Sequence, residues 1–146
     1  MGIYVNPGNI SFQEAINSKI YVDKSELIPY TNSVIRTQQK NLCVSRPRRF
    51  GKSMAADMLV AYYSRGCESA RLFSGLKSER DASFQSHLNQ YNVIRWDVQQ
   101  FLYHKSHLDI FIEEMQKAVI RELGAEYGDC FQADQYGLAG VLKQIY

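Results

Sequence analysis

The residues best suited to chemistry lie in one run, RPRRFGKS, at positions 46–53. Gly51, Lys52 and Ser53 match the second half of the phosphate-binding loop pattern G-x-x-x-x-G-K-[ST]. In that pattern glycine lets the backbone approach an anion, lysine reaches the terminal phosphates, and the serine hydroxyl is a ligand of Mg²⁺. The run therefore predicts a site for a nucleoside triphosphate with its Mg²⁺ ion.

The first glycine of the pattern is missing, because position 46 holds an arginine. Arg46 precedes Pro47, which favours extended backbone at Arg46 and offers no N–H to a phosphate. The tight turn must therefore be made differently. A Gly-Lys-Ser tripeptide alone is weak evidence, so the prediction depends on the flanking elements and on the added Arg48 and Arg49. The alternative is a solvated basic turn.

The elements expected to position this run are a strand before it and a helix after it. Residues 41–45 (NLCVS) are short and apolar and precede Pro47, which predicts a buried central strand. The sequence MAADMLVAYYSR then predicts a mostly buried helix that closes at Gly66, with Tyr62 and Tyr63 as core residues.

Further helices and a second strand are predicted along the chain. Ser11 and Glu14 suggest a capping box, helix-forming pieces flank Pro29, Phe84 and Leu88 indicate a short helix, and residues 91–98 (YNVIRWDV) predict a strand. An apolar stripe from Leu108 to Leu123 predicts a long helix that Ser106 caps and Gly124 stops, and residues 134–146 carry another apolar face.

The alternation of strands and helices predicts an α/β fold with helices packed on a mostly parallel sheet. Two strands are fewer than the roughly four to six that sheets usually hold, so we expect an incomplete sheet. The last amphipathic segment ends without glycine, charge or a polar tail. The chain is therefore expected to be a fragment.

Length, composition and charge predict one folded cytosolic domain. The chain has 146 residues, of which 45% are hydrophobic and 22% charged, and its formal charge is only +2. That charge is too small to indicate a nucleic-acid or membrane partner. The longest apolar stretch, Met58 to Tyr63, is far shorter than the roughly 20 residues that span a bilayer. The N-terminus lacks the plan of a secretion signal.

The three cysteines, Cys43, Cys67 and Cys130, are odd in number and widely spaced. This pattern is typical of reduced thiols rather than of a disulfide framework. Because Cys43 lies in the predicted strand, we expect it to act as a small hydrophobe.

Three segments resemble the AAA-ATPase-like family of bacterial proteins. The run SRPRRFGKSMAADML resembles the family's nucleotide loop, YVDKSELI resembles its upstream signature, and NVIRWDVQ resembles its second strand. The resemblance implies that residues 1–146 are the N-terminal part of a P-loop ATPase-type domain, in which Arg46 is usual. It also implies a nuclease-like domain toward the C-terminus of a longer protein, and an acidic hydrolysis motif after Tyr146.

The predicted ligand is MgATP, and hydrolysis depends on the acidic motif expected after the chain end. Lys52 is the catalytic candidate because it would neutralise the β- and γ-phosphates, and Ser53 is the Mg²⁺ ligand. The residues predicted to bind the nucleotide are Arg46, Arg48, Arg49, Phe50, Gly51, Lys52 and Ser53. The alternative function is a nonenzymatic module whose RPRR patch contacts a nucleic-acid backbone through charge.

Other candidate residues have two interpretations each. Asp97 is either a ligand of metal-bound water or a carboxylate that caps a strand end. His104 and His107 have a spacing that could suggest zinc, but surface histidines at a helix start explain it better. Asp23 and Lys24, in the upstream signature, form either an ion pair that stabilises the fold or a contact to nucleotide.

Overall fold

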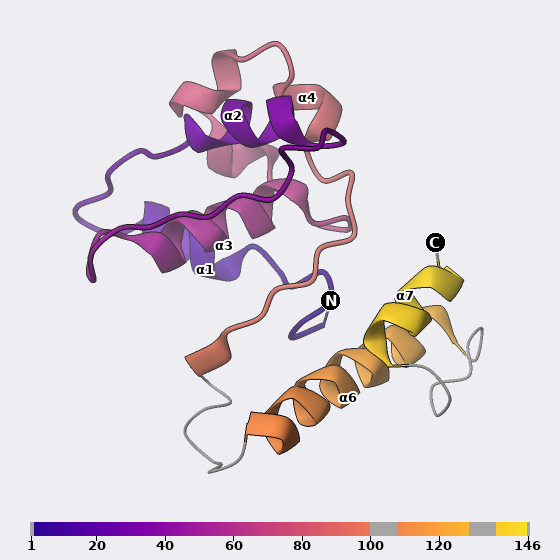
Figure 1. The fold of residues 1–146 in the computed structure, drawn as a ribbon. Helices are drawn as coiled ribbons and strands as arrows, with labels where there is room; N and C mark the ends of the chain where they lie inside the picture. The colour runs from indigo at the N-terminus through magenta and orange to yellow at the C-terminus, as the bar shows by residue number, and fades with distance from the viewer. Residues whose placement is uncertain (1, 100–107, 129–136, 146) are drawn as a thin grey trace. The chain divides into compact units, whose positions relative to one another are not determined.

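The computed structural model describes residues 2–99, 108–128 and 137–145. The chain divides into two compact units. The first unit is Asn6–Val93, and the second combines Met1–Val5 with Ile94–Tyr146. Figure 1 colours the chain by residue number, and each unit is described separately below.

The elements of the first unit are all helical. They are α1 (Ile10–Ile16), α2 (Leu27–Val34), α3 (Lys52–Tyr63), the 3₁₀ turns η1 (Ala70–Phe73) and η2 (Lys77–Arg80), and α4 (Phe84–His87). The predicted helix after the basic run is confirmed as α3, and the predicted short helix is confirmed as α4. After α2 the chain makes turns at residues 35–39, and residues 40–47 then have no regular structure (Figure 1).

The predicted α/β fold with a parallel sheet is wrong for the part of the chain that the structure describes. Two isolated bridges are present there instead of a sheet: Val5 pairs with Ile94 antiparallel, and Ser64 pairs with Tyr91 parallel. Residues 91–98 thus form isolated β-bridges rather than a strand. Short β-branched and aromatic runs favour pairing but do not specify a partner, which is why the pattern misleads here.

The predicted central strand at residues 41–45 is also wrong. The whole stretch 41–50 is exposed and contains no regular structure before the turn at residue 48. Val44 keeps 55% of its surface exposed, and Cys43, predicted to be buried, is exposed as well. The sequence predicted burial from apolar character alone, whereas the described residues place no partner strand beside this segment.

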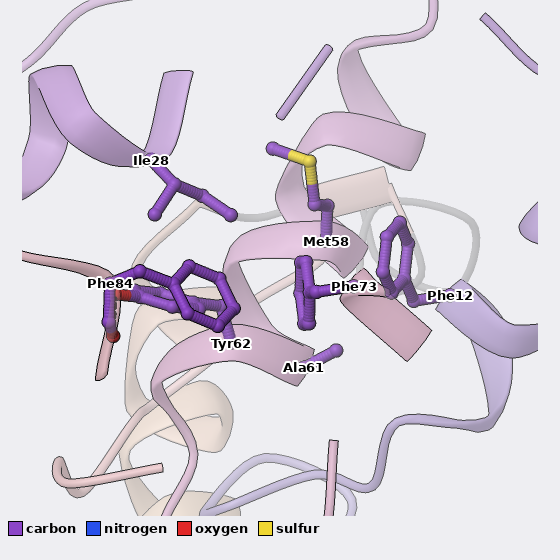
Figure 2. Close-up of a cluster of buried hydrophobic side chains, with 7 residues drawn as sticks. All are labelled: Phe12, Ile28, Met58, Ala61, Tyr62, Phe73 and Phe84. Atoms are coloured by element: carbon purple, nitrogen blue, oxygen red, sulfur yellow. Dashed lines mark hydrogen bonds between the residues drawn. The ribbon is translucent and has the colours of Figure 1, made fainter. Parts of the chain in front are cut away.

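An aromatic core holds the first unit together around α3. Figure 2 shows the buried cluster, to which α3 contributes Met58, Ala61 and Tyr62. The other members are Phe12, Ile28, Phe73 and Phe84. The ring centroids of Tyr62 and Phe73 lie 5.6 Å apart in an edge-to-face arrangement, and those of Phe12 and Phe73 are stacked at 5.0 Å. Such aromatic pairs add about 1 kcal/mol each beyond the burial of their area.

Buried polar bonds tie α3 to α2 and α4. Asn32 in α2 donates to the Tyr62 hydroxyl at 3.0 Å and to Ser83 Oγ at 2.9 Å. The Tyr62 hydroxyl donates to the carbonyl of Phe84 at 2.7 Å, and the Tyr63 hydroxyl donates to Asn32 Oδ1 at 2.7 Å. Burial raises the pKa of Tyr63 to about 12, so its hydroxyl stays protonated in this network. The C-terminal half of α3 is therefore fixed on two sides.

Helix boundaries differ from the sequence expectations at three places. Asn9 precedes α1, so Ser11 lies inside the helix and the predicted capping box does not form. Pro29 occupies the first turn of α2, where its missing N–H has no intrahelical acceptor to lose. The predicted stop at Gly124 is wrong, because α6 (Leu108–Tyr127) continues past it. An internal glycine costs a helix only about 1 kcal/mol, which packing can offset.

The second unit has its own core between α6 and α7 (Leu138–Ile145). The buried residues are Val5, Val119, Leu123, Leu138 and Val141. The apolar faces predicted for these two segments are thus confirmed at these positions, whereas Ile112 of the same stripe keeps 45% of its surface exposed. A cavity of about 400 Å³ opens beside this core and is lined mainly by apolar side chains, among them Trp96, Phe111 and Met115.

The N-terminal segment of the second unit binds a side chain of α6. Glu122 accepts hydrogen bonds from the backbone N–H groups of Ile3, Tyr4 and Val5, each at 2.8 Å. Bonds to a carboxylate are stronger than neutral ones. They hold Val5 where it enters the core.

Among the described helices, none is both long and apolar enough to cross a membrane.

Candidate functional site

The basic run lies in an exposed loop that leads directly into α3. Gly51 is the residue before the helix and has left-handed backbone, with φ 73° and ψ 31°. Glycine adopts this conformation without the steric cost that a Cβ would bring. The Ala55 N–H bonds to the Gly51 carbonyl at 3.0 Å, so the helical bonding begins at this residue. The N–H groups of the first turn have no acceptor within the helix and carry partial positive charge.

Lys52 folds back over the loop that precedes it. Its Nζ donates to the carbonyl of Arg46 at 2.5 Å and to the carbonyl of Pro47 at 3.1 Å. An ammonium group has three donors, and these two bonds use two of them. The lysine therefore closes residues 46–52 into a ring in which its charge lies beside the loop backbone.

Two left-handed residues shape the end of the loop. Arg49 has φ 69° and Gly51 has φ 73°, whereas Phe50 between them does not have positive φ. Backbone nests bind anions where right-handed and left-handed residues alternate, because this turns successive N–H groups toward one concave side. For Arg49, a left-handed conformation costs about 1 kcal/mol or more, because its Cβ crowds the backbone.

The side chains around this turn are accessible from solvent. Phe50 keeps 60% of its surface exposed, and the three arginines, Lys52 and Ser53 are exposed too. The structure thus brings the predicted residues 46 and 48–53 together in one loop and one helical turn. The electrostatic character of the loop is basic, since four of its side chains are cationic.

Ser53 is the one residue here that the sequence predicted as a metal ligand. The described residues contain no group of three or more histidine, cysteine or acidic side chains that could hold a metal ion. Mg²⁺ commonly keeps several waters and binds through substrate phosphates with only one or two protein ligands. A single serine hydroxyl fits that mode, so Mg²⁺ would be held here together with phosphate and not by a protein cage.

The upstream signature reaches the same loop through Lys24. Its Nζ donates to the carbonyl of Phe50. The Asp23 carboxylate accepts instead from the backbone N–H groups of Ser25 at 2.8 Å and Lys77 at 2.9 Å. Sequence reasoning left the role of these two residues open, and the bonds show that Lys24 approaches the loop while Asp23 faces η2. The sequence signal for a role of Lys24 at the loop was the resemblance of YVDKSELI to the family's upstream motif.

The remaining candidates are not part of this loop. Asp97 belongs to the second unit, where its carboxylate accepts from the Gln99 N–H at 3.0 Å. This is a local contact, as in one of its two interpretations, but the strand end assumed there does not form. His104 and His107 lie outside the described residues, as do Ser106 and Cys130. Cys67 is a buried free thiol whose pKa is raised by burial.

Comparison with known proteins gives one match. A family model described as a predicted AAA-ATPase matches residues 8–146. No curated protein and no solved structure matches the chain. The match includes the whole loop, α3 and the upstream signature.

Proposed function

Because the chain belongs to the family of predicted AAA-ATPases, we propose that it binds MgATP through residues 46–53. The observation that carries this proposal is the loop itself. Gly51 turns the backbone into α3, and Lys52 lies over the loop carbonyls of Arg46 and Pro47. A helix start, a left-handed turn and a lysine together offer N–H donors and positive charge to one anion.

In the proposed complex the residues of the loop have specific roles in binding phosphate or Mg²⁺. Lys52 directs its remaining donor to the β- and γ-phosphates, and the N–H groups of Gly51 and of the first turn of α3 bind phosphate oxygens. Arg48 and Arg49 supply charge-assisted bonds to the same group. Ser53 Oγ contributes one ligand to Mg²⁺, which when bound neutralises part of the phosphate charge. The proposal concerns binding, because hydrolysis also needs a group that orients water.

The burial of the C-terminal half of α3 supports this assignment. Met58, Ala61 and Tyr62 are fully buried in the aromatic core, whereas Lys52 and Ser53 at the other end are exposed. The helix is therefore fixed at one end and open to a ligand at the other. Removal of Lys52 should leave this core unchanged.

The test is calorimetric titration of MgATP into the wild-type chain and into Lys52→Ala. We expect affinity to fall by about 10- to 100-fold in the variant, the value of one charged hydrogen bond. The free energy of unfolding without nucleotide should change by less than about 0.5 kcal/mol, as for other surface substitutions. Lys19→Ala, at an exposed position outside the loop, is the control. Equal affinity in wild type and Lys52→Ala would show that the loop is not the site.

A nucleic-acid backbone is the second candidate ligand. The observation in its favour is the exposure of three arginines beside Phe50, since cationic and aromatic side chains together bind single strands. Such binding falls steeply with salt because it releases counterions. A titration with an oligonucleotide at low and high salt separates the two candidates: tight, strongly salt-dependent binding that ignores Lys52→Ala and Mg²⁺ favours nucleic acid.

A further inference from the structure

Lys24 makes a long-range contact to the phosphate-binding loop that no role yet explains. It lies 26 residues before Phe50, between α1 and α2, and its Nζ donates to the Phe50 carbonyl. A Cβ placed on Gly51 would lie 2.5 Å from the same Nζ. The amine of Lys24 therefore lies beside the Phe50–Gly51 peptide, in the space that a Cβ at position 51 would enter.

The backbone around Lys24 is fixed to the folded part of the first unit. Asp23 accepts from the Lys77 N–H at 2.9 Å, and the Ser25 hydroxyl accepts from the Ser78 N–H at 3.0 Å. Ser25 is fully buried. Bonds on both sides of Lys24 thus join its segment to η2, and its side chain extends from a firm base toward the loop.

The geometry of a peptide unit gives this contact a consequence for anion binding. The unit is planar and trans, so the carbonyl of Phe50 and the N–H of Gly51 point in opposite directions. While Lys24 binds the carbonyl, the N–H must face away from Lys24. Without that bond the exposed peptide could rotate and present its carbonyl oxygen, which repels phosphate, in place of its N–H.

We propose that Lys24 is a positioning residue for the nucleotide site, which holds the Phe50–Gly51 peptide so that the Gly51 N–H faces the bound phosphate. The inference rests on the proposed function, because it assigns a direction to a donor of that site. Lys24 acts through the Phe50 carbonyl and does not itself contact the phosphate. In this proposal the Lys24 ammonium group is therefore not a ligand of the nucleotide.

The experiment compares MgATP affinity in the wild-type chain, Lys24→Met, Lys24→Arg and Lys19→Met. Lys24→Met keeps most of the apolar stem and removes the donor, and we expect it to weaken binding by about tenfold, as for one lost hydrogen bond to a charged group. Lys24→Arg retains a donor and should recover most of the affinity. Lys19→Met removes the same charge at an exposed position and should bind like wild type.

Two further readouts separate positioning from other roles. Lys24→Gln retains a hydrogen-bond donor but removes the charge, so it should bind MgATP better than Lys24→Met if Lys24 positions the peptide, and no better if Lys24 acts only through its charge. Loss of a positioning residue should also weaken the binding of MgATP, MgADP and inorganic triphosphate by the same factor, because the Gly51 N–H contacts phosphate and not the base.

Each outcome decides the question. If wild type binds and Lys24→Met binds equally well, the inference is wrong and the proposed function stands. Equally weak binding by Lys24→Gln and Lys24→Met would mean that Lys24 acts through its charge and would also overturn the inference. If wild type binds no MgATP, the proposed function fails and the inference fails with it.

Discussion

Two regions of this molecule bring charged side chains to the backbone, and they differ in the sign of that charge. In the second unit, the N–H groups of residues 3–5 bind the carboxylate of Glu122, an anion that the chain itself supplies. At residues 46–53, the side chains that approach the loop are lysines, Lys24 and Lys52, which bind carbonyl oxygens. The internal anion completes a structural contact, whereas under the proposed function the loop with its lysines receives an anion from outside.

Removal of the internal anion is the most direct test of this difference between the two regions. Glu122→Gln replaces an acceptor of three charge-assisted bonds by a neutral amide, and we expect the free energy of unfolding of the second unit to fall by about 2 kcal/mol. Urea denaturation measures this loss. Glu126→Gln, exposed on the same helix, removes the same charge and should change stability little. MgATP affinity should be unchanged in both, since Glu122 belongs to a structural contact.

A second test alters the backbone of the loop without changing charge. Gly51→Ala places a Cβ at φ 73° and against the Lys24 amine, so we expect a loss of about 1 kcal/mol in stability together with weaker MgATP binding. Gly66→Ala is the matched control, because its φ is 82° but a Cβ there would meet nothing within 4 Å. Both variants should lose similar stability in denaturation. Equal MgATP affinity in the two would contradict the importance of the Gly51 turn.

The smallest expected effect concerns Asp23, a second carboxylate that binds backbone N–H groups. Burial acts to raise its pKa, but the hydrogen bonds from Lys77 and Ser25 outweigh it and lower the pKa below the ordinary value. Because the folded-state pKa is the lower one, the stabilisation is present above about pH 4 and is lost as pH falls through the folded pKa. Asp23→Asn should therefore reduce stability near neutral pH, and its difference from wild type should shrink as pH falls through the folded-state pKa.

Urea midpoints of wild type and Asp23→Asn measured across that acid range test the sign. Glu14→Gln, at an exposed position on α1, is the control for loss of a surface carboxylate. A difference between wild type and Asp23→Asn that grows as pH falls would show that the Asp23 contacts do not favour its ionised form.

Helices could be predicted from the sequence because their evidence is local and repeated. The apolar positions of α3 and of α6 recur over three or more turns, and the packing that they predict is present. The strands could not be predicted in the same way. Leu42 and Val44 satisfy the composition of a buried strand, but strand formation requires a partner that lies elsewhere in the chain. A local pattern contains no information about that partner.

The candidate site likewise has one part that could be predicted from the sequence and another that could not. Gly51, Lys52 and Ser53 could be placed at a helix start because motif and helix are adjacent in sequence. The contact of Lys24 with Phe50 spans 26 residues and depends on how the segment before α2 packs against η2. The left-handed conformation of Arg49 was equally hidden, since arginine has no preference for it.

The cavity in the second unit has a spectroscopic consequence through the residue at its rim. Trp96 is the single tryptophan of the chain, and 41% of its surface is exposed. Its indole lines the cavity together with Met115 and Leu138. Fluorescence excited selectively in the indole band therefore reports on the second unit alone, because the first unit contains no tryptophan. Denaturation followed by indole emission and by circular dichroism would then reveal whether the two units unfold together or in sequence.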